Sequence, residues 1–154
     1  LMQRAGGAVF EQCQSLFANS DVYLILLGQG NNAGDGYITA LNAKKAGKKV
    51  HVCAIEPDRV LDGDAGTAQK QWVDAGGSIK PFDVALIEKA DVVIDALLGT
   101  GINSYIRNEF ADVIDAINDS STPVVSIDVP SGLDANTGQS LGRCVQADVS
   151  LAVN

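Results

Sequence analysis

Residues 22–36 read Val22-Tyr23-Leu24-Ile25-Leu26-Leu27-Gly28-Gln29-Gly30-Asn31-Asn32-Ala33-Gly34-Asp35-Gly36. The first six residues form a continuous apolar run, which is typical of a strand buried on both faces. The glycine-rich segment after it predicts a turn that leads into a helix over residues 37–46. Glycine lets the backbone approach a ligand closely, and the start of a helix offers unpaired N–H groups to an anion. The stretch therefore predicts a ligand site directly after a strand.

The same alternation of apolar runs and amphipathic segments continues along the chain. Strands are expected at 22–27, 50–55, 92–96, 124–127 and 149–153, with a short one around Ile79 that Pro81 ends. Helices are expected at 1–17, 37–46, 66–75, 87–90 and 110–118. Continuous β-branched runs that alternate with helices predict an α/β fold with a mostly parallel central sheet covered on both faces. The usual strand order for such a sheet is 3-2-1-4-5-6.

The length and composition of the chain limit the kinds of protein it can be. The chain has 154 residues and a formal net charge of −8, so we expect one domain and no nucleic-acid partner. No apolar run approaches the roughly 20 residues that span a bilayer, so we expect no membrane partner. Cys13, Cys53 and Cys144 lie in helical or strand-like patterns without a Cys-x-x-Cys pair, which indicates reduced thiols in a cytoplasmic protein. The ends suggest that residues 1–154 are one domain, cut at the carboxyl end of a longer chain.

Polar residues follow three of the expected strands at the points where the strands end. Asn31, Asn32 and Asp35 follow the strand at 22–27. Asp95 ends the strand at 92–96, and Asp128 ends the strand at 124–127, three residues before Ser131. In a doubly wound sheet, ligands bind at the carboxyl ends of the strands beside the switch in strand order. We therefore expect these three segments to converge on one crevice.

The two later carboxylates have both a structural and a functional interpretation. Asp95 follows Val92-Val93-Ile94, where a carboxylate is costly unless something pairs with it. It caps a turn or, with Asn32 and Ser131, forms an all-oxygen cation site; a single carboxylate favours a monovalent ion. Asp128 caps its loop or offers an acid/base group beside a glycine turn.

A nicotinamide dehydrogenase is an open alternative. Gly28-x-Gly30-x-x-Ala33 matches the dinucleotide fingerprint with alanine in third place. Glu56 could serve as the ribose-binding acid, although its surroundings are more typical of a solvated turn. A dehydrogenase also needs a proton donor, and His51, the one histidine, has no evident partner.

Three segments resemble the YjeF N-terminal domain family, the NAD(P)H-hydrate epimerases. They are residues 31–37, residues 95–101 and residues 125–132, and Met2-Gln3-Arg4-Ala5-Gly6 is similar to the family's first helix. The resemblance implies a Rossmann-like three-layer αβα sandwich and an isomerase that repairs nicotinamide cofactors. Its substrates would be NADHX and NADPHX, whose R and S epimers it would interconvert. It also implies a potassium ion, a homodimer, and an NAD(P)H-hydrate dehydratase partner that is fused in many bacterial relatives.

The resemblance carries site residues onto this chain. Asn32, Asp95 and Ser131 would hold potassium, and Asp128 would face the hydrated ring as the catalytic acid/base. The substrate would contact two segments and Asp128; the segments comprise Asn31, Asn32, Ala33, Gly34 and Asp35, and then Gly99, Thr100, Gly101, Ile102, Asn103, Ser104 and Tyr105. Ala33 replaces the family's more usual glycine. A non-catalytic nucleotide-binding or dimeric scaffold domain of the same fold is the alternative function.

Overall fold

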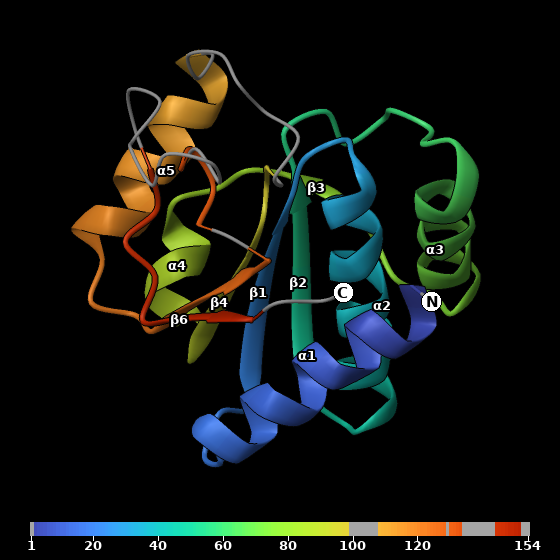
Figure 1. Ribbon diagram of the computed structural model, residues 1–154, viewed down its shortest axis with the longest axis horizontal. Coiled ribbons are helices and arrows are strands. Elements are labelled where there is room, and N and C mark those ends of the chain that lie inside the picture. The colour runs from blue at the N-terminus through green and yellow to red at the C-terminus, as the bar shows by residue number, and fades with distance from the viewer. Residues whose placement is uncertain (1, 99–107, 129, 134–143, 152–154) are drawn as a thin grey trace.

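The computed structural model describes residues 2–98, 108–128, 130–133 and 144–151 of the chain. Its centre is a six-stranded sheet, all of whose described pairings are parallel, in the order β3-β2-β1-β4-β5-β6 (Figure 1). The strands are β1 (Val22–Leu27), β2 (Lys49–Ala54), β3 (Lys80–Pro81), β4 (Val92–Ala96), β5 (Val124–Ile127) and β6 (Val149–Leu151). The predicted fold class and strand order are confirmed.

Five described helices cover the two faces of this sheet. They are α1 (Met2–Leu16), α2 (Asn31–Lys45), α3 (Gly63–Asp74), α4 (Ala85–Lys89) and α5 (Asn108–Asp119). Alternate residues of β1 point to opposite faces, as the two-residue period of a strand requires. Tyr23, Ile25 and Leu27 pack in the core with α1, α2 and α3, whereas Leu24 and Leu26 pack with α4 and α5. The result is a three-layer αβα sandwich.

The start of α2 differs from the sequence prediction. We expected the helix to begin at Tyr37, but it begins at Asn31, and Gly30 is its N-cap residue with an extended backbone. Asn31, Asn32 and Asp35 therefore lie in the first turns of the helix and not in a loop. The glycines at 34 and 36 hid the helical pattern because glycine lowers helix propensity.

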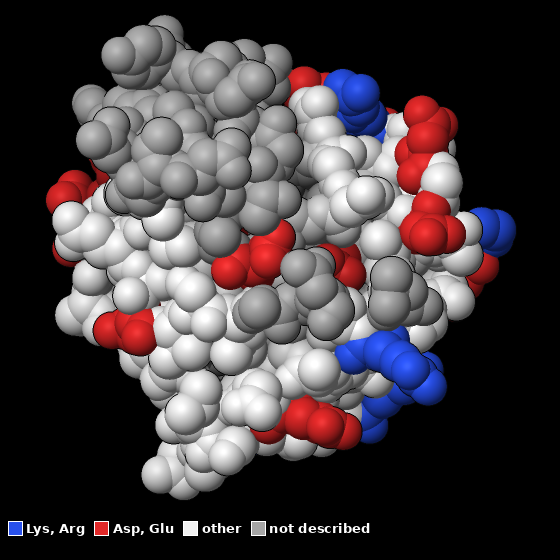
Figure 2. Space-filling model, in the orientation of Figure 1, with Lys and Arg blue, Asp and Glu red and all other residues white. Residues whose placement is uncertain are grey.

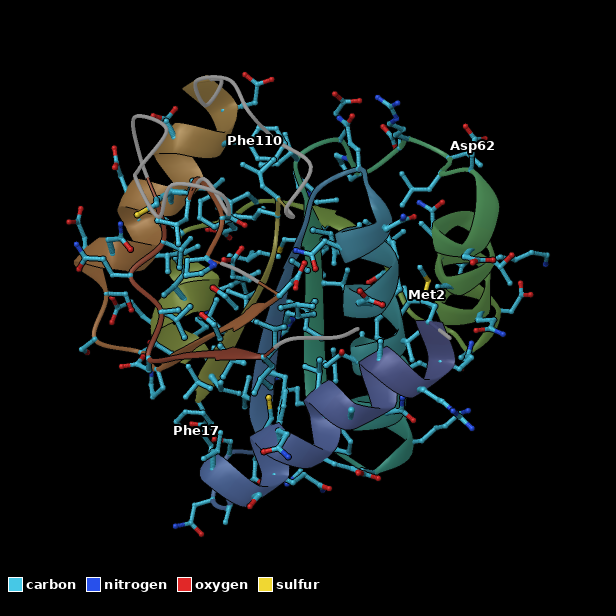
Figure 3. The ribbon with its side chains drawn as sticks, in the orientation of Figure 1. Met2, Phe17, Asp62 and Phe110 are labelled. Carbon is cyan, nitrogen blue, oxygen red and sulfur yellow. The ribbon has the colours of Figure 1, made fainter. Side chains whose placement is uncertain are left out.

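Tight helix packing explains those glycines. A Cβ added at Gly36 would lie 2.3 Å from Leu27 Cδ2 and 2.9 Å from Ala96 Cβ, so α2 rests directly on β1 and β4. A Cβ at Gly34 would lie 2.5 Å from Met2 Sδ, and Figure 3 shows Met2 at the start of α1 beside α2 and α3. The small residues position the first turns of α2 against the sheet.

Other boundaries differ by a few residues. β3 ends at Pro81 as predicted, but Ile79 lies just before the strand; an edge strand tolerates proline because one side of its backbone needs no ladder partner. Cys144 is half-buried in an irregular segment and not in a helix or strand. None of the helices in the described ranges is long and apolar enough to cross a membrane.

Candidate active site

The terminal segment of β4, residues 95–98, is the centre of the candidate site. Asp95 and Ser126 are register partners on β4 and β5, so their side chains lie on the same face. Gly28 N donates to Ala96 O at 3.1 Å, and a Cβ at Gly28 would lie 1.9 Å from Leu97 O. Glycine at position 28 thus allows the end of β1 to pass close to this segment.

Asp95 is fully buried and joins three parts of the chain. Its Oδ2 accepts hydrogen bonds from Ser126 Oγ at 2.6 Å and from Ser131 N at 2.9 Å. Its Oδ1 accepts from Ser131 Oγ at 2.5 Å and from Leu97 N at 3.2 Å. Burial raises the pKa of the Asp95 carboxyl, and these hydrogen bonds act in the opposite direction. These four hydrogen bonds offset the cost of burying the carboxylate.

Asn32 reaches the same segment from α2. Its side chain is 8% exposed, and Nδ2 donates to Leu98 O at 3.0 Å. Its Oδ1 is buried and has no hydrogen-bond partner among the described residues. A buried acceptor without a partner costs about 1–3 kcal/mol, so this oxygen is placed to meet a donor or a cation. Ser131 Oγ also contacts Leu98, accepting from its N–H at 2.8 Å.

Asp128 lies at the end of β5 with a left-handed backbone. Its φ is 74°, the one positive value at a non-glycine residue in the described part of the chain. Such a conformation is uncommon outside glycine, asparagine and aspartate and is often found at functional sites. The Asp128 N–H donates to Leu151 O at 2.7 Å, so the ladder to β6 fixes this strained residue.

Asp35 is a second carboxylate in the same region. It is 7% exposed on the second turn of α2, and α2 contacts β1, β4 and β5. Burial raises the pKa of Asp35 to about 6, and the nearby charge of Asp128 adds to the rise. In Figure 2, acidic side chains lie together near the middle of the face shown, with no Lys or Arg of the described residues among them.

Among the described residues, no side chain caps the backbone N–H groups at the start of α2. No side chain caps the helix at Gly30, and among the described residues nothing lies within 4 Å of a Cβ built there. The first N–H groups of a helix bind anions, and phosphates are common ligands at such positions. Asn31 is exposed beside them.

The structure brings most of the predicted site residues together. Asn32, Asp95 and Ser131 all contact residues 95–98, and Asp35 and Asp128 interact electrostatically. Ala33 is buried in the helix, where alanine is the most favourable residue, so the departure from glycine fits this backbone. The predicted segment Gly99 to Tyr105 lies outside the described residues.

Sequence reasoning missed two residues. Ser126 binds Asp95, and the signal was a hydroxyl inside the otherwise apolar strand Val124–Ile127. Gln29 Nε2 is buried without a hydrogen-bond partner in the described part of the chain. The glycines on either side of Gln29 predicted a turn, but no sequence pattern indicated a role for the Gln29 amide.

The fold and this site define a doubly wound α/β protein whose oxygen-rich site lies at the carboxyl edge of the sheet, the usual place for nucleotides in this class. Among the described residues, no group of three His, Cys, Asp or Glu side chains could hold a metal ion. The model of the family described as YjeF-related protein N-terminus matches residues 1–154. The chain belongs to this family.

Named relatives are similar over nearly the whole chain. The bifunctional NAD(P)H-hydrate repair enzyme of Escherichia coli is 41% identical over 148 residues, covering 96% of this chain and 29% of that protein. The bifunctional enzyme of Leishmania braziliensis is 44% identical over 152 residues, covering 96% of this chain and 27% of that protein. The NAD(P)H-hydrate epimerase of Rhodopirellula baltica is 35% identical, covering 98% of this chain and 63% of that protein. The chain therefore spans less than a third of the two bifunctional relatives.

A solved structure supports the fold. The crystal structure of yeast ynu0 has a TM-score of 0.85 at 23% identity, and the match covers 97% of this chain and 68% of that one. At this identity, the similarity supports the three-layer architecture alone.

Proposed function

We propose that this chain is an NAD(P)H-hydrate epimerase domain, which interconverts the R and S forms of NADHX and NADPHX. The observation that carries the proposal is the meeting of three polar segments around residues 95–98, with Asp128 in a strained backbone beside them. The epimerase relative of Rhodopirellula baltica and the bifunctional repair enzymes support the reaction and its substrates. The N–H groups at the start of α2 suit the phosphates of a dinucleotide.

Asp128 supplies the acid/base chemistry in this proposal. A proton given to the ring hydroxyl turns it into water, and the C–O bond breaks with its electrons on oxygen. The lone pair of the ring nitrogen stabilises the resulting cation, so water can return to either face of the ring carbon. A proton-transfer group of this kind contributes about 10²–10⁴-fold to a rate.

Potassium is the ion that fits the oxygen atoms of the site. The buried Asn32 Oδ1 lacks a partner, Ser131 provides a hydroxyl, and Asp95 provides one negative charge. Hard cations prefer oxygen ligands, and one carboxylate suits a single positive charge. We propose that Asn32, Asp95 and Ser131 hold the ion. Potassium would act there as a weak Lewis acid that organises the segments around the substrate.

The proposal includes partners and location. We infer a homodimer and an NAD(P)H-hydrate dehydratase, fused or separate, which would consume the S epimer; the names of the bifunctional relatives support this partner. A cytoplasmic location agrees with Cys13, Cys53 and Cys144, which are all unpaired.

A coupled assay tests the function. The protein is incubated with an R/S mixture of NADHX and a dehydratase that accepts the S form alone, beside a blank without the protein. Complete consumption, faster than in the blank, is expected of an epimerase. Consumption that stalls at the R form as in the blank supports a non-catalytic scaffold domain. Oxidation of intact NADH by an added carbonyl compound supports a dehydrogenase. Either of these two results contradicts the proposal.

A further inference from the structure

We infer that Asp35 is a second catalytic residue and that Asp35 and Asp128 work as a pair, one giving a proton to the departing hydroxyl while the other takes a proton from the incoming water. The inference rests on the proposed epimerase function and deepens it. It goes beyond a binding role for the start of α2, because it gives the Asp35 carboxyl a part in bond breaking.

Contacts on two sides of β4 bring the two carboxylates into one region. Gly36, the neighbour of Asp35, packs against Ala96 at the end of β4. Ser131, three residues after Asp128 in the sequence, donates its N–H to Asp95 Oδ2 on the same strand at 2.9 Å. The two acidic residues thus come from α2 and β5 and flank the end of β4. Asn32, one turn before Asp35 on α2, donates to Leu98 O at 3.0 Å, and Leu98 N donates to Ser131 Oγ at 2.8 Å, so both elements meet at Leu98.

The surroundings of Asp35 favour a carboxyl that keeps a proton near neutral pH. The residue is 7% exposed, and among the described residues no donor forms a hydrogen bond to its carboxylate. Burial first, and then the charge of Asp128, disfavour the ionised form of the Asp35 carboxyl. Asp128 is half-buried and has a fixed backbone. One protonated and one ionised carboxyl is the arrangement that acid/base chemistry in both directions requires.

Other charged groups on the elements around α2 do not raise the pKa of Asp35. Those elements carry Arg4 and Glu11 on α1, Lys49 and His51 on β2, Asp64, Lys70 and Asp74 on α3, and Asp95 on β4. Among the described residues, Asp128 is the charged group that raises the pKa of Asp35.

The proposed reaction needs only the two carboxyl groups, the substrate and one water molecule. The protonated carboxyl gives its proton to the hydroxyl, the C–O bond breaks with both electrons on oxygen, and water leaves. The ring nitrogen lone pair fills the empty orbital on carbon. A water oxygen then forms the new C–O bond, and the ionised carboxylate removes its extra proton. One proton has passed between the two carboxyls, and the reverse epimerisation returns it.

The test compares four proteins: the wild type, Asp35→Asn, Asp128→Asn and the control Asp112→Asn, which changes an exposed acid on α5. Asparagine has the shape of aspartate and tolerates the left-handed backbone at position 128. The conversion of R-NADHX into the S form is followed from pH 5 to pH 9. Substrate binding and thermal unfolding are measured on each protein, so loss of fold is separated from loss of chemistry.

A bell-shaped dependence of kcat on pH is expected for the wild type and for Asp112→Asn, because the reaction needs one proton on the pair. In Asp35→Asn we expect kcat to fall by about 10²–10⁴-fold with substrate affinity changed less than about tenfold, and one limb of the bell to disappear. An active wild type with full kcat and an unchanged pH profile in Asp35→Asn would overturn the pairing and leave the proposed function standing. An inactive wild type would overturn both.

Discussion

At the scale of single residues, Asp35 links the site to stability. An aspartate whose pKa rises from 3.8 to about 6 on folding is a destabilising group once it ionises. It binds its proton more tightly in the folded protein, so its contribution to the free energy of unfolding is largest below pH 4 and is lost as the pH rises through 6. Active sites commonly retain residues that destabilise the fold, because the reaction depends on those residues.

The variant Asp35→Asn should therefore be more stable than the wild type at neutral pH. A shift from 3.8 to about 6 corresponds to about 3 kcal/mol above pH 7, a gain that should shrink toward zero at pH 3.5. Urea unfolding at several pH values measures it, with Asp112→Asn as the control that shows no such trend. A difference between wild type and Asp35→Asn that stays constant with pH would contradict the assigned environment of Asp35.

Single residues also show how far sequence reasoning reached into the site. Asn32, Asp95 and Ser131 could be predicted to meet because each follows a parallel strand, and such strands end at one edge of the sheet. The hydrogen bonds within the site could not be predicted, since they depend on register: Asp95 faces Ser126 because these two residues pair across β4 and β5. The left-handed backbone of Asp128 likewise had no signal in an ordinary aspartate.

At the scale of elements, the crossing of α1 and α2 positions the first turns of α2. A Cβ at Gly6 would lie 2.4 Å from Ile38 Cβ and 3.1 Å from Asp35 O, whereas nothing lies within 4 Å of one built at Gly7. At the same crossing, Thr39 Oγ1 donates hydrogen bonds to Asp35 O at 2.8 Å and to Gly6 O at 3.3 Å. The close approach of α1 therefore supports the backbone of Asp35.

Two neighbouring substitutions in α1 test this packing. We expect Gly7→Ala to stabilise the protein by about 0.5–1 kcal/mol, because alanine favours the helix and meets no neighbour. We expect Gly6→Ala to destabilise it by about 1–3 kcal/mol, because the added methyl forces α1 away from Ile38. Urea unfolding compares the two. Equal effects at both positions would contradict the close contact between α1 and α2.

Element boundaries were harder to predict than element types. The helix after β1 was predicted from its apolar period, but six residues at its start lacked that period. Five of them, residues 32–36, are buried by contact with β1, β4 and α1, and their small or polar side chains follow tertiary packing. The first turns of α2 therefore lack the apolar repeat that identifies a helix in a sequence.

At the scale of the whole molecule, the order β3-β2-β1-β4-β5-β6 places the site where α2, β4 and the segment after β5 meet. Figure 3 shows Asp62 and Phe110 toward the end of the molecule where β1 finishes and α2 starts, and Phe17 at the opposite end. The topology could be predicted from the sequence because crossovers between parallel strands are almost always right-handed and doubly wound sheets share a common strand order.

Potassium should stabilise the whole domain if the oxygens of the site bind it. At about ten times its dissociation constant, an ion stabilises the folded state by about 1.4 kcal/mol, which raises the Tm of a domain of this size by about 3–6 °C. Thermal unfolding in potassium chloride and in lithium chloride at equal ionic strength measures the difference. We expect a higher Tm in potassium for the wild type and for Asn31→Leu, and no difference for Asn32→Leu.

Asn31 is the matched control because it is an exposed amide beside the buried one. A wild-type Tm that is the same in both salts would contradict the potassium site and leave the acid/base proposal untouched.

Following the two epimers separately tests most directly whether the segments around β4 catalyse epimerisation. Pure R-NADHX and pure S-NADHX are each incubated with the folded protein, and the configuration at the hydrated ring carbon is followed by NMR. Both samples should reach the same R/S ratio, much faster than in buffer alone, and Asp128→Asn should slow this approach by about 10²–10⁴-fold. If the folded wild-type protein leaves both samples interconverting at the rate seen in buffer, the domain is not an epimerase.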